Sequence, residues 1–78
     1  MPTTTIILID RETNEPIEGE EVCLSFPYGG FTENVWTDFN GEAIVSHSSR
    51  GEADLYINSN YAGKVMAPGV IRKNKKSR

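Results

Sequence analysis

The stretch Thr37-Asp38-Phe39-Asn40-Gly41-Glu42-Ala43 indicates the fold class, because it separates two strand-like runs at Val35-Trp36 and Ile44-Val45. An Asp side chain can accept a hydrogen bond from the backbone two residues on, Asn tolerates a left-handed conformation, and Gly takes a positive φ without steric cost. The stretch therefore predicts a tight reversal, a β-hairpin, with a positive φ at Gly41.

Short runs of strand character, separated by turn residues, fill the rest of the sequence. Alternation of apolar and polar residues, or runs of β-branched residues, predict strands over 3–9, 20–26, 31–37, 42–47, 52–57 and 61–67, with a short last strand at 70–71. No window combines helical periodicity with a capping residue, so little or no helix is expected. The pattern predicts an all-β fold, a small Greek-key β-sandwich of six to seven antiparallel strands of the prealbumin or immunoglobulin-like kind.

The alternation also predicts the core. The inward faces of the strands carry Val22, Leu24, Phe26, Ala43, Val45, Ala53, Leu55 and Ile57. Ile17 is the one apolar residue in the loop 10–19, and we expect it to plug one end of the core. Val35 and Trp36 are adjacent, so they must point to opposite faces of their strand. Trp36 is expected to point inward, because a core this small needs its largest side chain.

Length and composition indicate one ordinary globular domain, assigned to residues 1–71. The chain has 78 residues, of which 37% are hydrophobic and 24% charged, as in soluble proteins. Cys23 is the single cysteine, so no internal disulfide can form. The run Ile6-Ile7-Leu8-Ile9 is too short for a membrane span or a signal-peptide core, so the expected location is cytoplasmic, with no membrane partner.

Charge divides the chain into two unequal parts. Residues 1–71 hold three basic and all eleven acidic side chains, a net charge of −8, whereas residues 72–78 hold five basic ones. Residues 72–78 are therefore predicted to form a basic, disordered tail. The alternative is a tail that binds nucleic acid phosphates, but the acidic body would repel the same backbone, and no aromatic residue lies among the lysines.

Two segments resemble known families. Asp10-x-x-Thr13-x-x-Pro16-Ile17-x-Gly19, followed by Thr37-Asp38-x-Asn40-Gly41-x-Ala43, resembles the carboxypeptidase regulatory-like domains, a transthyretin-like group of Greek-key β-sandwiches. Residues 53–64 resemble the hairpin of PEGA domains, another small β-sandwich module. The resemblance implies an accessory or adhesive module. Transthyretin-like hydrolases carry several His and Arg residues and a C-terminal Tyr-Arg-Gly-Ser, which this sequence lacks, so a hydrolase is a remote alternative.

Catalytic and metal chemistry find little support in the sequence. His47 lies in Ser46-His47-Ser48-Ser49, but adjacent strand residues point to opposite faces and no third group is placed to orient the imidazole. The one His and the one Cys do not have zinc spacing. Asp38-x-Asn40-Gly41-Glu42 lacks the further ligands of a calcium loop. We therefore expect no enzyme activity, no catalytic residues, no metal and no cofactor.

The remaining prediction is a structural or protein-interaction module whose partner is another protein. Outward aromatic side chains are large, rigid and amphipathic, which suits an interface, and basic side chains could add charge complementarity. The predicted partner-binding residues are Tyr56, Tyr61, Phe39, Arg72, Lys73, Lys75 and Lys76.

Overall fold

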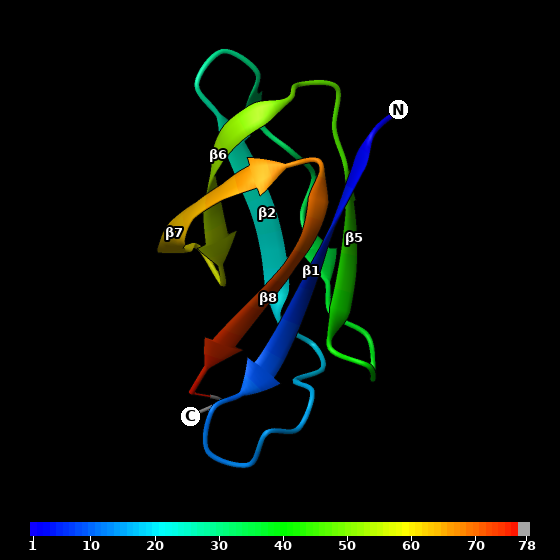
Figure 1. Ribbon diagram of the computed structural model, residues 1–78, viewed down its shortest axis with the longest axis vertical. Helices are drawn as coiled ribbons and strands as arrows, with labels where there is room; N and C mark the ends of the chain where they lie inside the picture. The colour runs from blue at the N-terminus through cyan, green and yellow to red at the C-terminus, as the bar shows by residue number, and fades with distance from the viewer. Residues whose placement is uncertain (77–78) are drawn as a thin grey trace.

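Eight strands in two packed sheets make up the protein, as a computed structural model that describes residues 1–76 shows (Figure 1). The strands are β1 (Thr3–Asp10), β2 (Glu21–Phe26), β3 (Gly30–Phe31), β4 (Val35–Trp36), β5 (Glu42–Ser46), β6 (Gly51–Ile57), β7 (Asn60–Ala67) and β8 (Gly69–Lys75). The described part of the chain has no helix, and so none that could cross a membrane. The prediction of a small all-β sandwich is confirmed.

One sheet has three strands in the order β5-β1-β8, and the other has five, in the order β3-β2-β6-β7 with β4 also paired to β2. The chain crosses between the two sheets four times, after β1, β4, β5 and β7. β1 pairs antiparallel with β5 but parallel with β8. This parallel pair departs from the predicted antiparallel pairing, and it arises because β7 returns the chain to the end of the sandwich at which β1 begins (Figure 1).

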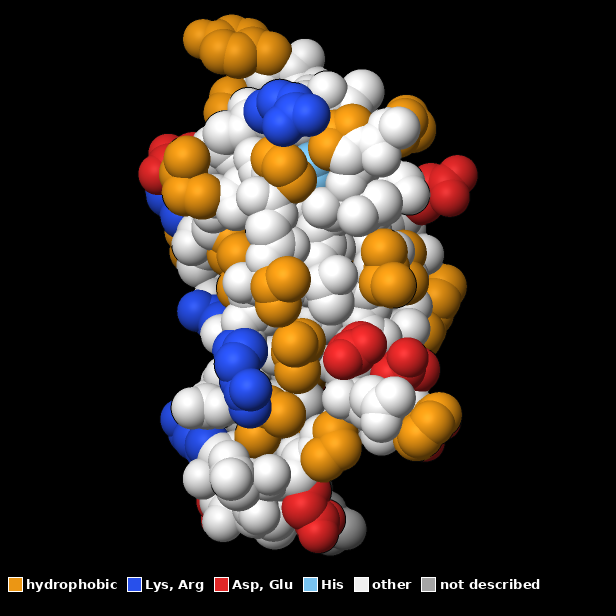
Figure 2. Space-filling view, turned by 45° about the vertical axis from the view of Figure 1, so that its right-hand side comes forward, with side chains coloured by type: hydrophobic (Ala, Val, Ile, Leu, Met, Phe, Trp, Pro, Cys, Tyr) orange, Lys and Arg blue, Asp and Glu red, His pale blue; other side chains and the backbone are white. Residues whose placement is uncertain are grey.

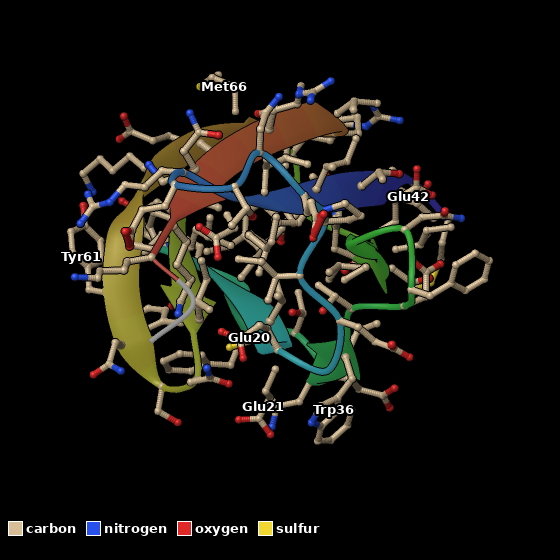
Figure 3. All side chains as sticks on the ribbon, turned by 90° about the horizontal axis from the view of Figure 1, so that it is seen from below. Glu20, Glu21, Trp36, Glu42, Tyr61 and Met66 are labelled. Atoms are coloured by element: carbon tan, nitrogen blue, oxygen red, sulfur yellow. The ribbon has the colours of Figure 1, made fainter. Side chains whose placement is uncertain are left out.

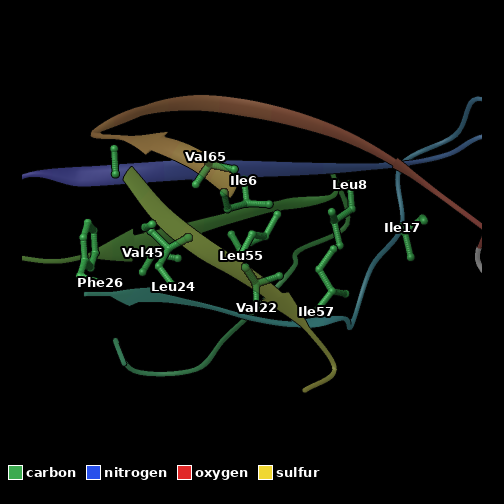
Figure 4. Packing of buried hydrophobic residues seen from close by; sticks show 13 residues of the cluster. Ile6, Leu8, Ile17, Val22, Leu24, Phe26, Val45, Leu55, Ile57 and Val65 are labelled. Atoms are coloured by element: carbon green, nitrogen blue, oxygen red, sulfur yellow. The ribbon is translucent and has the colours of Figure 1, made fainter. Parts of the chain in front are cut away.

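The core lies between the two sheets, and every residue predicted for it except Trp36 is buried. Figure 4 shows the inward side chains of β2, β5 and β6 meeting those of β1, with Ile17 at one end. Ile6 and Leu8 are fully buried, as are Val22, Leu24 and Leu55. Period-two alternation therefore identified the inward faces of β2, β5 and β6 correctly.

The prediction that Trp36 points inward is wrong. β4 pairs antiparallel with β2 so that Val35 lies opposite Val22 and Trp36 lies opposite Glu21. Residues directly opposite each other point to the same face of a sheet, and Val22 is in the core. Val35 is therefore the inward residue, packed against the core, while Trp36 is 58% exposed.

The reversal at residues 37–43 has the predicted local geometry but a different place in the fold. Gly41 has a φ of 76°, and the Asn40 amide donates a hydrogen bond of 2.9 Å to Asp38 Oδ1. However, β4 pairs with β2 and β5 pairs with β1, so the two flanking strands belong to different sheets. The turn is a corner between the sheets and not the predicted hairpin.

The predicted disordered tail is wrong for residues 72–75, which belong to β8. The Arg11 amide donates a 3.1 Å hydrogen bond to the Lys75 carbonyl oxygen, and Lys75 Nζ lies 2.9 Å from Glu20 Oε1. β8 forms because β1 has a second edge whose backbone polar groups need partners. The domain therefore extends past residue 71. Residue 76 has no regular structure, and residues 77–78 lie outside the described residues.

Candidate functional site

The outer face of the five-stranded sheet carries three aromatic side chains in contact, Phe31, Tyr56 and Tyr61, here called the aromatic row. The ring centroids of Phe31 and Tyr56 are 5.4 Å apart, and those of Tyr56 and Tyr61 are 5.9 Å apart. Both distances lie in the range of attractive tilted and edge-to-face aromatic pairs. The row spans three strands, since Phe31 belongs to β3, Tyr56 to β6 and Tyr61 to β7.

A two-residue turn places the two tyrosines side by side. Asn58 and Ser59 have φ values of 52° and 68°, so the β6–β7 turn has the positive φ at both central residues that a tight hairpin needs. Tyr56 lies directly opposite Tyr61 in the resulting register. Asn58 also accepts a hydrogen bond from the Glu21 amide at 3.0 Å, which ties the turn to the start of β2.

Phe31 belongs to the row, although it was not among the predicted partner-binding residues. β3 folds back on β2 and places Phe31 opposite Ser25. Ser25 lies between two buried residues, Leu24 and Phe26, so its side chain and that of Phe31 point outward. The turn Pro27-Tyr28-Gly29-Gly30 could have revealed this position from the sequence. It predicts a hairpin, and the pairing in a hairpin decides to which side of the sheet the side chain of the next residue, Phe31, points.

The row is accessible to a partner. Phe31 is 67% exposed and Tyr61 is 58% exposed, while Tyr56 is half-buried between them. Beside Tyr56 lies a hollow of about 340 Å³, lined by Cys23, Phe31, Thr32, Asn34, Tyr56 and Ser59. Thr32 is held in place there, because its Oγ1 accepts a 2.9 Å hydrogen bond from the Leu24 amide. The arrangement offers apolar ring surfaces next to small polar groups.

Cys23 forms part of this hollow without being reactive. Burial raises the pKa of the Cys23 thiol, and the negative charge of Glu21 raises it further. The thiolate is the nucleophilic form of cysteine, so a raised pKa keeps the side chain in its unreactive form at neutral pH.

The structure does not gather all the predicted partner-binding residues on one surface. Phe39 is 73% exposed in the corner between β4 and β5, and it makes no ring contact with any aromatic side chain of the described residues. Tyr56 and Tyr61 lie on the five-stranded sheet, whereas Arg72, Lys73 and Lys75 lie on β8 of the three-stranded sheet.

The basic residues differ in how freely they could reach a partner. Arg72 and Lys76 are exposed. Lys73 is half-buried, and its Nζ lies 3.2 Å from where a Cβ of Gly63 would be. Lys75 pairs with Glu20, and this hydrogen bond is the main cause that lowers the pKa of Glu20, against the opposing effect of burial. The basic end of the sequence is therefore partly used inside the fold.

His47 is buried, and both of its ring nitrogens are occupied. Nδ1 lies 2.7 Å from the Ser49 carbonyl oxygen, which can only accept, so Nδ1 is the donor. Nε2 lies 2.7 Å from Thr4 Oγ1, and the ring packs against Phe26 at 5.2 Å. With 4% of its surface exposed, His47 joins the start of β1 to the end of β5.

Figure 3 shows Met66 of β7 and Glu42 of β5 on the side of β1 and β8, and Glu21 and Trp36 on the opposite side, so each side carries an acidic and a hydrophobic side chain. Within residues 1–76, no three His, Cys, Asp or Glu side chains are grouped so that they could hold a metal ion.

The sequence matches no protein-family model, and no curated protein is significantly similar to it.

Proposed function

We propose that the chain is a non-catalytic module that binds another protein through the aromatic row. The observation that carries this proposal is the contact between Phe31, Tyr56 and Tyr61 on an outer sheet face, with two of the rings more than half exposed. Aromatic side chains are the residues most enriched at the energetic centres of interfaces. The resemblance to accessory β-sandwich modules supports the same role.

The surroundings of the row suit a protein partner. Asp54 and Lys64 lie opposite each other next to the row and form an ion pair of 2.8 Å. An apolar centre with polar side chains around it is the usual arrangement of a protein interface. The partner surface that fits is an apolar side chain or short segment that packs on the rings, with polar groups at its edge.

The rival functions have less support. A hydrolase of the transthyretin type would need a free base, and both nitrogens of His47 are engaged within the fold. A nucleic-acid-binding tail would need its basic side chains free, and Lys75 is held by Glu20 while Lys73 lies over Gly63.

Binding of host proteins by matched surface variants tests the proposal. Phe31→Ser and Tyr61→Ser each remove a ring of the row, and Tyr28→Ser is the control, because Tyr28 is fully exposed in the β2–β3 turn and makes no ring contact within residues 1–76. We expect a host protein that binds wild type and Tyr28→Ser equally and loses about tenfold or more in affinity for the two row variants. That protein is then purified and its affinity measured directly. Equal affinities for all four forms would contradict the proposal.

A further inference from the structure

The outer face of the three-stranded sheet pairs an apolar strip with two opposite charges. Ile7 of β1 lies directly opposite Glu42 of β5 on one side and Arg72 of β8 on the other. In the next outward row, Thr5 lies between Ile44 and Val70. One row across the face therefore has an acidic, an apolar and a basic side chain in that order, and the next row has no charged side chain.

Within residues 1–76, two of the apolar side chains of this face are exposed and its two charged side chains form no ion pair. Ile44 is 58% and Val70 is 68% exposed, although outward positions of such a sheet are usually polar. Glu42 and Arg72 are separated by two strand spacings, about 10 Å, and neither forms an ion pair with any residue in the described part of the chain. Figure 2 shows the same order in its lower half, with basic side chains to the left of a hydrophobic band and acidic ones to the right.

We propose that a second copy of this chain packs on this face, related to the first by a two-fold axis that runs parallel to β1. Such an axis exchanges left and right between two stacked sheets. Glu42 of each copy then faces Arg72 of the other, Ile7 faces Ile7, and Ile44 faces Val70. Two ion pairs form across an apolar centre, and no like charges meet.

The charge pattern selects this orientation. A two-fold axis perpendicular to β1 but still parallel to the sheets would place Glu42 against Glu42 and Arg72 against Arg72, which costs affinity. Among the outward residues in the paired registers of β5, β1 and β8, Glu42 is the one acidic and Arg72 the one basic side chain, so these strand positions do not oppose the approach of two copies, although residues 1–71 have a net charge of −8.

Edge-to-edge pairing of the sheets is a weaker route to association. Lys73 and Lys75 alternate with the outward residues of the edge strand β8, and inward-pointing charges on an edge strand discourage the addition of another strand. A sheet of only three strands offers a small contact area, which is typical of a weak and reversible dimer. The face belongs to the three-stranded sheet, whereas Tyr56 and Tyr61 belong to the five-stranded sheet, so these two tyrosines lie outside the proposed dimer contact.

Sedimentation of charge-reversal variants tests the dimer. The variants are Glu42→Arg, Arg72→Glu and the double variant, each checked for β-structure by circular dichroism and studied up to about 1 mM, since weak dimers need high concentration. We expect a monomer–dimer equilibrium for wild type and about tenfold or greater weakening in each single variant, where like charges meet twice. An equimolar mixture of the two single variants should form dimers again, because one copy then carries both Arg and the other both Glu. The double variant should also recover.

Several results would overturn the dimer. These are a wild type that stays monomeric at all concentrations, single variants that dimerise as well as wild type, a mixture that fails to recover, and species that grow beyond the dimer. Because Glu42 is half-buried, Arg72→Glu serves alone if Glu42→Arg does not fold, with Val70→Asp as a second disruption of the same face. The control is Tyr61→Ser, a change on β7 of the other sheet, which should dimerise as wild type does. Its failure to bind a host protein would concern the aromatic row alone.

Discussion

The backbones of Gly41 and Leu8 approach so closely that a side chain at position 41 has no room. The Leu8 amide donates a 2.8 Å hydrogen bond to the Gly41 carbonyl oxygen, and a Cβ on Gly41 would lie 2.5 Å from the Leu8 carbonyl oxygen. Pro16 and Ile17 close the same space, at 3.0 and 3.2 Å. The φ of 76° is a second and separate requirement for glycine. The corner between the two sheets depends on both.

Gly41→Ala should therefore destabilise the domain more than the conformation alone would cause. A non-glycine residue in the left-handed region costs about 1–2 kcal/mol, and displacement of Leu8 or Pro16 adds to it. The control is Gly19→Ala, since Gly19 has a φ of 80° but open space around its Cβ position. Urea unfolding of both variants measures the difference. Equal losses of unfolding free energy would show that the close approach has no effect.

Leu55→Ala should remove about 2–5 kcal/mol of unfolding free energy, because it leaves a cavity at a fully buried position between the sheets. A domain of this size has a small stability margin, so this loss is a large fraction of its total unfolding free energy. Met66→Ala is the matched control on β7, where the side chain is 65% exposed, and should change stability by less than about 0.5 kcal/mol. Thermal unfolding followed by circular dichroism decides whether the two differ as expected.

The inward faces of β2, β5 and β6 could be predicted because half-buried strands alternate apolar and polar residues. The orientation of Trp36 could not be predicted in this way. Val35 and Trp36 are adjacent and both apolar, so either could point into the core, and only the pairing of β4 with β2 decides which one does. The C-terminal half of β8 was missed for another reason. Arg72-Lys73-Asn74-Lys75 has no hydrophobic alternation, and its partner β1 lies more than sixty positions away.

The candidate site was predictable only in part. Tyr56 and Tyr61 flank a turn that the sequence shows plainly, so their proximity follows from local chemistry. The turn before Phe31 predicts its facing, but Phe31 reaches Tyr56 only because β2 pairs with the distant β6, and no local pattern carries that register. The charged row of Glu42, Ile7 and Arg72 likewise appears only once three distant segments lie side by side.

Thr4→Val should destabilise the domain by about 1–3 kcal/mol, because it keeps the shape of the side chain but leaves His47 Nε2 buried without its partner. Thr5→Val is the control, since Thr5 is half-buried on the opposite face of β1 and its side chain makes no hydrogen bond within residues 1–76. Replacing both partners, as Thr4→Val with His47→Phe, should recover part of the loss. A double-mutant cycle measured by chemical denaturation gives the coupling free energy between Thr4 and His47. If the losses of unfolding free energy in the two single variants simply add in the double variant, the predicted coupling is contradicted.

Glu20→Gln should reduce the stability of the protein at neutral pH but not in acid. Lys75 holds the pKa of Glu20 below its ordinary value of 4.5, so the stabilisation is complete above that pH and is lost as the pH falls through the lowered pKa. Since the side chains of Lys75 and Glu20 are 29% and 19% exposed, we expect about 0.5–1 kcal/mol. Glu18→Gln, an exposed change two positions away, is the control. A difference from wild type that stays constant as the pH is lowered from neutral through the acid range would count against the pair.

β8 should behave as a paired strand and not as an appendage. Because the Arg11 amide donates to the Lys75 carbonyl oxygen, parallel geometry turns the amides of Lys73 and Lys75 toward β1 and those of Arg72 and Asn74 toward the free edge. Hydrogen exchange should therefore alternate along the strand, slow at the Lys73 amide and fast at the Arg72 amide.

Deleting residues 72–78 should lower the melting temperature by about 5 °C or more, since a loss of ~1 kcal/mol in unfolding free energy shifts the melting temperature of a domain of this size by that much. Arg72→Gln with Lys73→Gln removes two charges but keeps the backbone pairing, and should cost far less. Uniformly fast exchange and an unchanged melting temperature after the deletion would restore the disordered tail that the charge pattern predicted.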